Sequence, residues 1–457
     1  MSQPLSPPAA FDLAIIGAGA SGTLLAAALL RTARTPLQVL LLEQSGRFGR
    51  GPAYSTTELQ HLLNVPAGKM SALADDPEHF LRWLRTQAPD TRPTDFVPRA
   101  RYALYLDAVL AEARAKAAPG VQLTQRHAQV RGLQPGAGGV TVQLEEGGSV
   151  RAARAVLALG NFPPAALAVP DGGLYASERY VALPWESGGL EAVAPEESVL
   201  LLGSGLTAVD VALSLQARGH TGPVHALSRH GLLPQVHRAG VAPHTFAPGA
   251  LRARALLREV RAEVRRVEAA GGDWRAVVDA LRPHTVPLWQ RLATADKRRF
   301  LRHLRAYWEV HRHRMAPEVG RAIAELLAGG QLRIHAAHVQ AFALEADGVR
   351  VTLRRRGGPG VQHLHVQRVL NCTGPASPLA QPKGTLVGDL LAGGLARADA
   401  LRLGLDTREG ALVDAQGKPS SVLFALGGVR RPELWESTAI PEIRTQAQAL
   451  AQHLLAS

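Results

Sequence analysis

The chain of 457 residues is long enough for two or three domains with a substantial core. An apolar fraction of 46% and a mean hydropathy of −0.01 are typical of a globular protein and exclude a disordered one. The single cysteine, Cys372, excludes an intramolecular disulfide, and residues 1–10 lack the basic stretch that begins a secretory signal. We therefore expect a cytoplasmic protein.

The net charge of +13 is concentrated in one stretch of the chain. Residues 251–330 contain 17 arginines and lysines against 9 aspartates and glutamates. A positive field of this kind can attract nucleic acid. Because arginines and glutamates alternate there, as on a solvated helix with local ion pairs, we expect a helical surface and no nucleic-acid partner.

The first segment is predicted to be half of a doubly wound α/β unit: a strand at 12–16, a glycine turn, a helix to about 30 and a strand at 37–43. Residues 13–30 are uncharged, which a hydropathy scan could interpret as a membrane span. The spacing of Gly17, Gly19 and Gly22 favours the strand, turn and helix instead, so no membrane association is expected.

The remaining elements follow from apolar periodicity. Helices are predicted at 79–85, 101–117, several positions within 251–327, and 443–455. Strands are predicted at 128–133, 139–144, 150–158, 331–335, 338–345, 348–355, 363–370 and 421–426. A second strand, turn and helix begins at 198, and its next strand ends near 228, so the nucleotide-binding unit occurs twice.

The first glycine turn has the pattern of a dinucleotide site, for which we predict FAD. In this pattern Gly17 permits the tight turn, Gly19 lets the backbone approach a pyrophosphate, and Gly22 lets the helix pack on the strand. The free N–H groups of the helix would face the phosphates. Glu43, at the end of the next strand, would accept hydrogen bonds from the ribose. The predicted turn residues are Gly17, Ala18, Gly19, Ala20, Ser21 and Gly22.

The second glycine turn predicts a nicotinamide dinucleotide, with NADPH favoured over NADH. Its turn residues are Gly203, Ser204, Gly205, Leu206 and Thr207, followed by alanine at the third glycine position. Gly17 and Glu43 are 26 residues apart, and the same offset from Gly203 reaches Arg229, next to Ser228. An arginine in place of the acid suits the 2′-phosphate of NADP.

Three apolar segments that end in glycine, at 156–160, 369–374 and 423–428, are predicted to link the two units. The predicted fold is therefore α/β, with two nested Rossmann-like domains and a helical insertion. We assign residues 1–165 and 335–457 to a discontinuous FAD-binding domain. Residues 166–334 are assigned to the NAD(P)-binding domain, including the helical region 251–330.

Several strings resemble a family of bacterial FAD/NAD(P)-binding flavoproteins typified by the uncharacterised protein YdhS. They lie at 51–56, 61–66, 205–210, 307–314 and 435–444, with Met70 and Ser71 between. More distantly, the chain resembles FAD- and NADPH-dependent N-hydroxylating monooxygenases. The resemblance places Asn64, Lys69 and Met70 at flavin- and substrate-facing positions, with Lys69 as an anion contact. The predicted FAD-binding set is completed by Gln44, Tyr54, Val130, Gly160 and Ile440.

The lone cysteine excludes a disulfide reductase, which needs a redox pair beside the flavin. The leading prediction is an NADPH-dependent flavin monooxygenase acting on a small substrate, with amine-bearing compounds as candidates. Two alternatives stay open: an NADPH oxidase or flavin reductase that passes electrons to a partner, and a non-catalytic FAD/NAD(P)-binding redox sensor.

His311 and His313 point to different sides of a helix, so no metal is expected, and the adjacent arginines are expected on a helical surface. The pattern identifies neither catalytic residues nor an oligomeric state.

Overall fold

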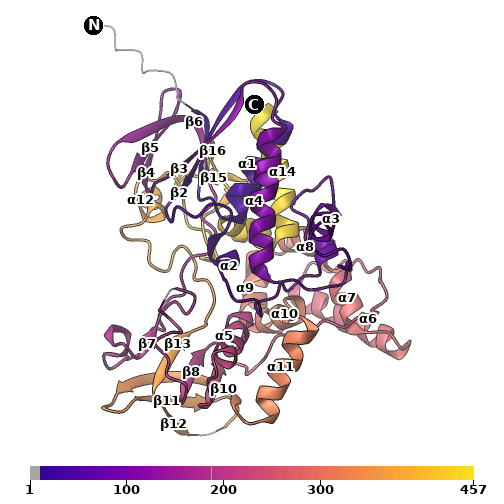
Figure 1. Cartoon of the computed structure of the whole chain (residues 1–457), viewed down its shortest axis with the longest axis vertical. Coiled ribbons are helices and arrows are strands. Elements are labelled where there is room, and N and C mark those ends of the chain that lie inside the picture. The colour runs from indigo at the N-terminus through magenta and orange to yellow at the C-terminus, as the bar shows by residue number, and fades with distance from the viewer. Residues whose placement is uncertain (1–10, 187, 359, 457) are drawn as a thin grey trace.

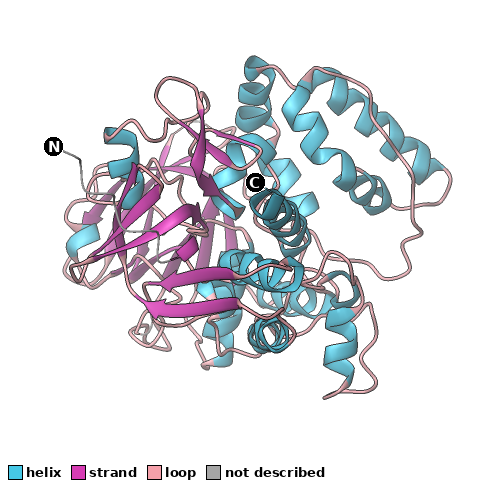
Figure 2. Ribbon diagram, turned by 90° about the horizontal axis from the view of Figure 1, so that it is seen from above, coloured by secondary structure: helices cyan, strands magenta, loops and turns pink. Residues whose placement is uncertain are grey.

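The fold of the chain was obtained as a computed structural model, which describes residues 11–186, 188–358 and 360–456. The described residues form two sheets, one above the other in Figure 1, with a group of helices beside them. Seen from above, most helices lie to one side of the strands (Figure 2). The segment 1–10, on which the argument about a secretory signal rests, lies outside the described residues.

The first sheet has nine strands among the described residues. Its path runs β14-β15-β16-β6-β1-β2-β3, with β5 and then β4 attached to β6 by antiparallel pairing. The central strands β16, β6, β1, β2 and β3 are parallel. The strands are β1 (Phe11–Ile16), β2 (Leu37–Glu43), β3 (Val121–His127), β4 (Val130–Gly136), β5 (Gly139–Leu144), β6 (Ser149–Leu157), β14 (Thr407–Arg408), β15 (Ala411–Val413) and β16 (Pro419–Ala425).

Helices α1, α4 and α14 cover one face of this sheet and stand side by side in Figure 1. Their apolar residues and those of the strands form one core, and α12 helps to close a second core on the opposite face. Burial on both faces explains the uninterrupted apolar runs of β1 and β2. The helices are α1 (Ala20–Thr32), α2 (Gly51–Tyr54), η1 (Ala67–Lys69), α3 (His79–Arg85), α4 (Arg99–Ala115), α12 (Leu386–Ala392), η4 (Gly427–Arg430), α13 (Arg431–Leu434) and α14 (Ile440–Ala456).

The second sheet follows the order β12-β11-β10-β9-β8-β13-β7. Strands β10, β9, β8, β13 and β7 are parallel, while β11 and β12 continue as antiparallel strands. Helices α5 and α11 pack on one face. The elements are β7 (Tyr180–Val181), β8 (Val199–Leu202), β9 (Val224–Ser228), β10 (Leu332–Leu344), β11 (Val349–Arg355), β12 (Val361–Val366), β13 (Arg368–Asn371), η2 (Leu174–Ala176), α5 (Leu206–Ala217) and α11 (Pro317–Ala328).

A helical region connects β9 to α11, as the sequence predicts. It packs on the first unit through a small apolar cluster that includes Trp289 and Trp435, whose ring centroids lie 5.0 Å apart. The indole Nε1–H of Trp289 also donates to the carbonyl of Pro432 at 2.8 Å. The helices are α6 (Ala253–Ala269), α7 (Trp274–Ala280), η3 (Arg282–His284), α8 (Thr285–Arg291), α9 (Thr294–His303) and α10 (Arg305–Arg312).

The boundary predicted at residue 335 differs from the division between the sheets. The segment at 331–345, predicted as two strands, is the single strand β10, whose first residues pair with β9 and whose later residues pair with β11. A bulge between Val339 and Ala341 shifts the register in which β10 pairs with β11. Strands β10 to β13 therefore belong to the second sheet, and the chain returns to the first sheet only after Asn371.

The uncharged run at 13–30 forms β1, a turn and α1 rather than one long helix. Within the part of the chain that the structure describes, no helix has the length and apolar character needed to cross a membrane.

A histidine pair, with His225 buried and His335 partly buried, joins β9 to β10 in the second sheet. His225 Nδ1 lies 2.9 Å from His335 Nε2, so one ring must donate and the other accept, which two protonated rings cannot do. Burial, reinforced by the repulsion that two protonated rings would exert on each other, lowers the pKa of His225 from the usual 6.5 to about 4, and burial also lowers the pKa of His335. The fold thus disfavours protonation of this pair.

We expect the protein to lose stability as the pH falls from 6.5 toward 4. Since the unfolded chain binds more protons than the fold in this window, the neutral pair contributes fully above pH 6.5, and about 1–3 kcal/mol should be lost on acidification. His225→Gln keeps a hydrogen-bonding side chain that does not titrate, so the free energy of unfolding of this variant should depend less on pH. Urea unfolding at several pH values checks it, with His338→Gln, an exposed histidine on the strand of His335, as the control. An equal slope in all three proteins would contradict the assignment.

Candidate functional site

The first glycine turn follows β1 and opens α1. Gly17 has a φ of +100°, and a Cβ there would lie closer than 3.0 Å to the carbonyl oxygen of Ala158. A Cβ at Gly22 would come equally close to the carbonyl of Gly17. At Gly19 the nearest atom to a Cβ would be Cα of Gly51, at an ordinary 3.7 Å. The fold itself therefore requires Gly17 and Gly22, whereas Gly19 has room in the absence of a ligand.

The N-terminus of α1 has the properties of an anion site. No side chain caps the helix, and its first turn, which includes Ala20 and Ser21, contains no acidic residue. The first N–H groups of a helix have no partner within it, and the positive end of its dipole favours negative charge. A pyrophosphate would satisfy both features.

Glu43 and Gln44 lie at the carboxyl edge of the first sheet, to which Val130 also belongs. Glu43 ends β2, and its Oε2 accepts a hydrogen bond from the Ala18 N–H at 2.9 Å. The carbonyl of Gln44 lies 3.0 Å from His127 Nε2, and Val130 begins β4. The structure thus places the predicted acid directly beside the glycine turn.

A third loop meets this turn from the C-terminal part of the chain. A Cβ at Gly427, which has a φ of +73°, would crowd the hydroxyl of Ser21, and one at Gly428 would crowd the carbonyl of Gly160. Next to Gly427, the buried hydroxyl of Ser437 has no hydrogen-bond partner. The predicted residues Gly160 and Ser21 are therefore brought together, and the unpartnered hydroxyl is a feature that a bound ligand would satisfy.

The segment from Tyr54 to Met70 runs along the helices of the first unit. The Tyr54 ring lies 5.0 Å from that of Tyr102, and burial raises the pKa of the Tyr54 phenol. The Tyr102 hydroxyl donates to the carbonyl of Met70 at 2.9 Å. Lys69 is exposed, whereas Ile440, the first residue of α14, is buried.

Asn64 connects this segment to the second unit. Its carbonyl accepts a hydrogen bond from His237 Nε2 at 3.0 Å. Burial and the charge of Arg314 lower the pKa of His237 to about 4, so the ring is neutral and its Nε2 carries the proton. Asn64 therefore lies where the two units meet.

The second glycine turn repeats the construction of the first. Gly203 has a φ of +119°, and a Cβ there would clash with the carbonyl of Cys372, while Gly205 has open space beside it. Gly205 precedes α5, whose first turn begins with Leu206 and Thr207 and carries no acid or side-chain cap.

Ser228, and not Arg229, occupies the position of Glu43. The N–H of each first glycine bonds to the residue before the strand end, Leu42 in one unit and Leu227 in the other. Ser228 Oγ lies 2.7 Å from Ser204 Oγ, as Glu43 lies beside Ala18. The predicted offset of 26 residues is therefore one too long here, and Arg229 stands one residue beyond the strand end, with its side chain exposed.

Helix α10 lies between the two units. On one side, the Tyr307 ring is 5.5 Å from that of His230, the neighbour of Arg229. On the other side, Trp308 Nε1–H donates to Glu436 at 2.8 Å, and Arg312 bonds to Glu442 at 3.2 Å. Sequence reasoning gave no role in the site to Glu436 and Glu442, although both lie within the string at 435–444.

The expectation of a helical surface for the arginines of this string is wrong. The side chains of Arg312 and Arg314 are 8% and 5% exposed, and Nε of each is buried without a partner. Buried charges are costly unless they are paired, and Arg312 is paired with Glu442 and lies 3.9 Å from Glu436. Helical periodicity alone could not show this, because the partners of Trp308 and Arg312 are Glu436 and Glu442, which are distant in sequence.

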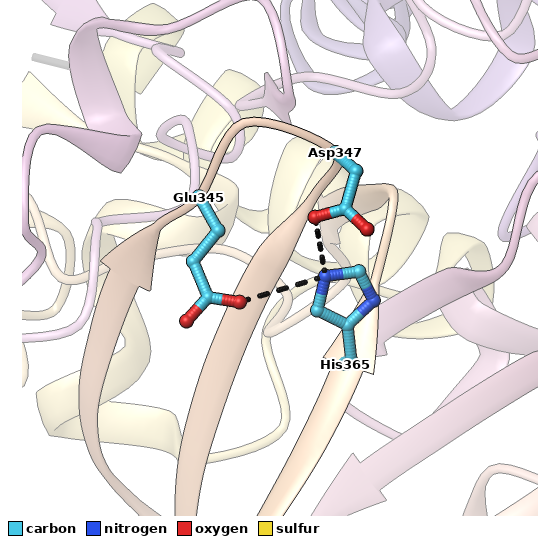
Figure 3. A group of neighbouring side chains, drawn as sticks. All are labelled: Glu345, Asp347 and His365. Atoms are coloured by element: carbon cyan, nitrogen blue, oxygen red, sulfur yellow. Dashed lines mark hydrogen bonds and ion pairs between the residues drawn. The ribbon is translucent and has the colours of Figure 1, made fainter.

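One group among the described residues has the composition of a metal site: Glu345, Asp347 and His365, at the hairpin of β10 and β11 and on β12 (Figure 3). His365 Nε2 lies 3.2 Å from Asp347 and 3.7 Å from Glu345. Arg350 also pairs with Glu345, at 2.6 Å. Ion pairs account for this exposed group, which is remote in sequence from both glycine turns.

A cavity of about 480 Å³ lies on the outer side of the first unit, between residues of α1, α3 and α4. Its charged side chains are paired with one another, as in Lys116 with Glu112 and His79 with Glu112. No residue of either glycine turn lines it, so this cavity is not a dinucleotide site.

A family of FAD-NAD(P)-binding domains matches residues 14–162, which include the first glycine turn and Gly160. No curated protein matches the chain in sequence.

Solved structures of flavoproteins share the fold over nearly the whole chain. L-lysine 6-monooxygenase from Pseudomonas syringae is 20% identical, with a TM-score of 0.66, covering 97% of this chain and 99% of its own. The ornithine N-hydroxylase of Kutzneria sp. 744 is 18% identical, with a TM-score of 0.64, covering 98% and 99%. The cadaverine monooxygenase DfoA of Erwinia amylovora is 13% identical, with a TM-score of 0.67, covering 98% and 95%. The chain therefore has the fold of flavoproteins with two dinucleotide-binding units.

Proposed function

We propose that the protein is an FAD- and NADPH-dependent monooxygenase that acts on a small amine-bearing substrate. The observation that carries the proposal is the pair of equivalent glycine turns, Gly17–Gly22 and Gly203–Ala208, each at the carboxyl edge of its own parallel sheet. Open α/β sheets bind ligands at this edge. The similar folds of N-hydroxylating enzymes for ornithine, lysine and cadaverine support the choice of reaction.

For FAD, the residues of the first turn fit the requirements of a pyrophosphate and a ribose. The uncapped N-terminus of α1 would bind the phosphates. Glu43, which already accepts from the Ala18 N–H, would also accept hydrogen bonds from the ribose hydroxyls. The unpartnered Ser437 hydroxyl lies at the same loop cluster. The wider predicted set, which includes Tyr54, Asn64, Met70 and Ile440, remains part of this proposal.

For NADPH, the absence of an acid at the end of β9 is the supporting feature. Ser228 replaces the carboxylate, so nothing there repels a 2′-phosphate, and the exposed guanidinium of Arg229 follows directly. An arginine binds a phosphate through parallel N–H groups, which gives geometric selectivity as well as charge.

The state of Cys372 argues against disulfide chemistry, even though thioredoxin reductases share the fold at a TM-score of 0.51. Cys372 is the sole cysteine of the sequence, it is buried, and burial raises the pKa of its thiol. A thiol of this kind is a poor nucleophile, since the thiolate is the reactive form. Bound FAD would instead take a hydride from NADPH and pass electrons to oxygen.

Three further assignments belong to this proposal. The family typified by YdhS remains the finer relationship that the strings indicate. A cytoplasmic location and the lack of a nucleic-acid partner are retained. For the latter, the basic residues of α6 are partly neutralised by neighbours, as where Arg266 bonds to Glu263 at 2.6 Å.

Anaerobic mixing of the FAD-loaded protein with NADPH tests the proposed function. We expect the flavin absorbance to be bleached, and readmission of air with an amine such as ornithine, lysine or cadaverine to give a hydroxylamine. Hydrogen peroxide with no hydroxylated product, for any small amine tried, would favour an oxidase or flavin reductase. A flavin that neither NADPH nor NADH bleaches would contradict the enzyme assignment.

We expect Gly19→Val to fold but to lose FAD. The apoprotein has room at this position, whereas a bound pyrophosphate would meet the new side chain. Flavin absorbance per chain and the melting temperature without FAD measure the two effects. Gly22→Ala is the matched contrast, since its methyl group meets the Gly17 carbonyl and should destabilise the apoprotein itself. Full flavin content in Gly19→Val would place the ligand elsewhere.

We expect Arg229→Ala to weaken NADPH binding while leaving NADH almost unchanged. A hydrogen bond to a charged group contributes roughly 1.5–3 kcal/mol, which is about tenfold to a hundredfold in affinity. Titration of the protein with both coenzymes gives the ratio, and Arg238→Ala, an arginine nearby in sequence that pairs with Asp273, serves as the control. An equal loss of affinity for both coenzymes would show that Arg229 does not bind the 2′-phosphate.

A further inference from the structure

A loop of the first unit is hydrogen-bonded to helix α5 of the second unit. His61, 1% exposed, lies at this contact. Its Nδ1 lies 2.7 Å from Thr56 Oγ1, and its Nε2 lies 2.8 Å from Ser214 Oγ and 3.2 Å from the carbonyl of Asp210. Burial lowers the pKa of His61, so the ring is neutral and donates through Nε2. This histidine belongs to the string at 61–66.

A buried ion pair lies beside this histidine. Arg99 Nη1 is 2.6 Å from Asp210 Oδ2, and the two side chains are 19% and 6% exposed. The Arg99 Nε–H also donates to the carbonyl of Leu62 at 3.1 Å. Removing one member of such a pair leaves an uncompensated charge in the interior, so the pair strongly favours one relative position of its two elements.

Apolar contacts close the same interface. Leu62 and Phe96, both from the first unit, pack against the core of the second unit. The Trp185 ring meets His61 edge-on, with centroids 5.0 Å apart. The loop is therefore built into the core of the neighbouring unit and does not merely touch its surface.

The position of this contact on α5 gives it a functional meaning. Asp210 and Ser214 are four residues apart and so share one face of the helix. The N-terminus of α5 follows the second glycine turn, where the coenzyme pyrophosphate is proposed to bind. The same loop continues through Asn64 to Ser71, whose carbonyl accepts from Arg444 of α14 at 2.8 Å. The stretch of about ten residues from His61 to Ser71 thus joins α5, at the proposed coenzyme site, to α14, in the unit proposed to bind the flavin.

We propose that His61 and Arg99 are positioning residues for hydride transfer: by holding Asp210 and Ser214, they fix α5, and with it the bound coenzyme, relative to the flavin. This role rests on the proposed function. Neither residue belongs to either glycine turn. Their contribution is orientation, and misplacement of a reacting group by about 1 Å can cost about a hundredfold in rate.

Single-turnover reduction of the FAD-loaded protein by NADPH tests the proposal. For Arg99→Met we expect the limiting rate constant of flavin bleaching to fall about tenfold or more, and for the milder Ser214→Ala about threefold. Flavin content, bleaching by dithionite and the preference for NADPH over NADH should stay at the wild-type values, since neither cofactor site is altered. Arg99→Lys should recover part of the rate through its charge.

A matched control lies on the rim of the same interface. Glu58 pairs with Arg218 of the second unit at 3.0 Å, and the two side chains are 28% and 37% exposed. Exposed pairs contribute little, so Glu58→Gln should reduce the flavin at the wild-type rate. If Arg99→Met fails to fold, the rate constants of flavin reduction in Ser214→Ala and Glu58→Gln are compared instead. Each of these substitutions removes a single hydrogen-bonding or charged group, and only Ser214→Ala should slow the reduction.

The outcomes separate the two proposals. Wild-type rate constants in Ser214→Ala and in folded Arg99→Met would overturn the positioning role alone. That role is also overturned if these variants lose flavin or melting temperature while the rate per bound flavin is unchanged, because the contact is then only structural. A wild-type protein that neither coenzyme reduces, but that dithionite does reduce, would overturn the proposed function and the positioning role with it.

Discussion

The fold depends on one repeated close approach: each first glycine lies directly against the strand end that carries the chain toward the other sheet. Gly17 faces the carbonyl of Ala158 after β6, and Gly203 faces that of Cys372 after β13. Only a residue without Cβ permits this packing, and both glycines also have a positive φ. The two connecting segments then run together, bridged at Phe162 and Ala376, so both glycine turns are held beside the crossing of the chain.

The helical region supports this arrangement from outside. Its α10 contacts the second unit through Tyr307 and the first unit through Trp308 and Arg312. Tyr307 meets His230, which adjoins Arg229, and Trp308 meets Glu436, which adjoins Ser437. The basic character of the region, which suggested an exposed surface, partly reflects arginines that pair with glutamates of α14 and the loop before it. The excess of basic residues in a stretch of sequence therefore did not indicate which of their side chains are exposed and which are buried.

Local features of the sequence predicted the two strand, turn and helix units, because glycine geometry and apolar runs are encoded within about 30 residues. The strand end at Glu43 and the bounds of helix α3 were also predicted, whereas the second strand end was placed only near residue 228. What could not be predicted depends on pairing between distant segments. The extension of β10 past residue 335 depends on its partner β11, and the one-residue shortening of the second unit appears only in the backbone hydrogen bonds. The burial of Arg312 depends on Glu442, which is 130 residues away.

The isolation of Cys372 has a practical consequence for spectroscopy. Its carbonyl faces Gly203, its side chain is buried, and the sequence contains no other cysteine. A cysteine introduced at an exposed site would therefore be the reactive thiol in an otherwise silent background. Fluorophores or spin labels could then be attached at chosen points of the two units without first removing a native cysteine, and distances between the units could be followed in solution.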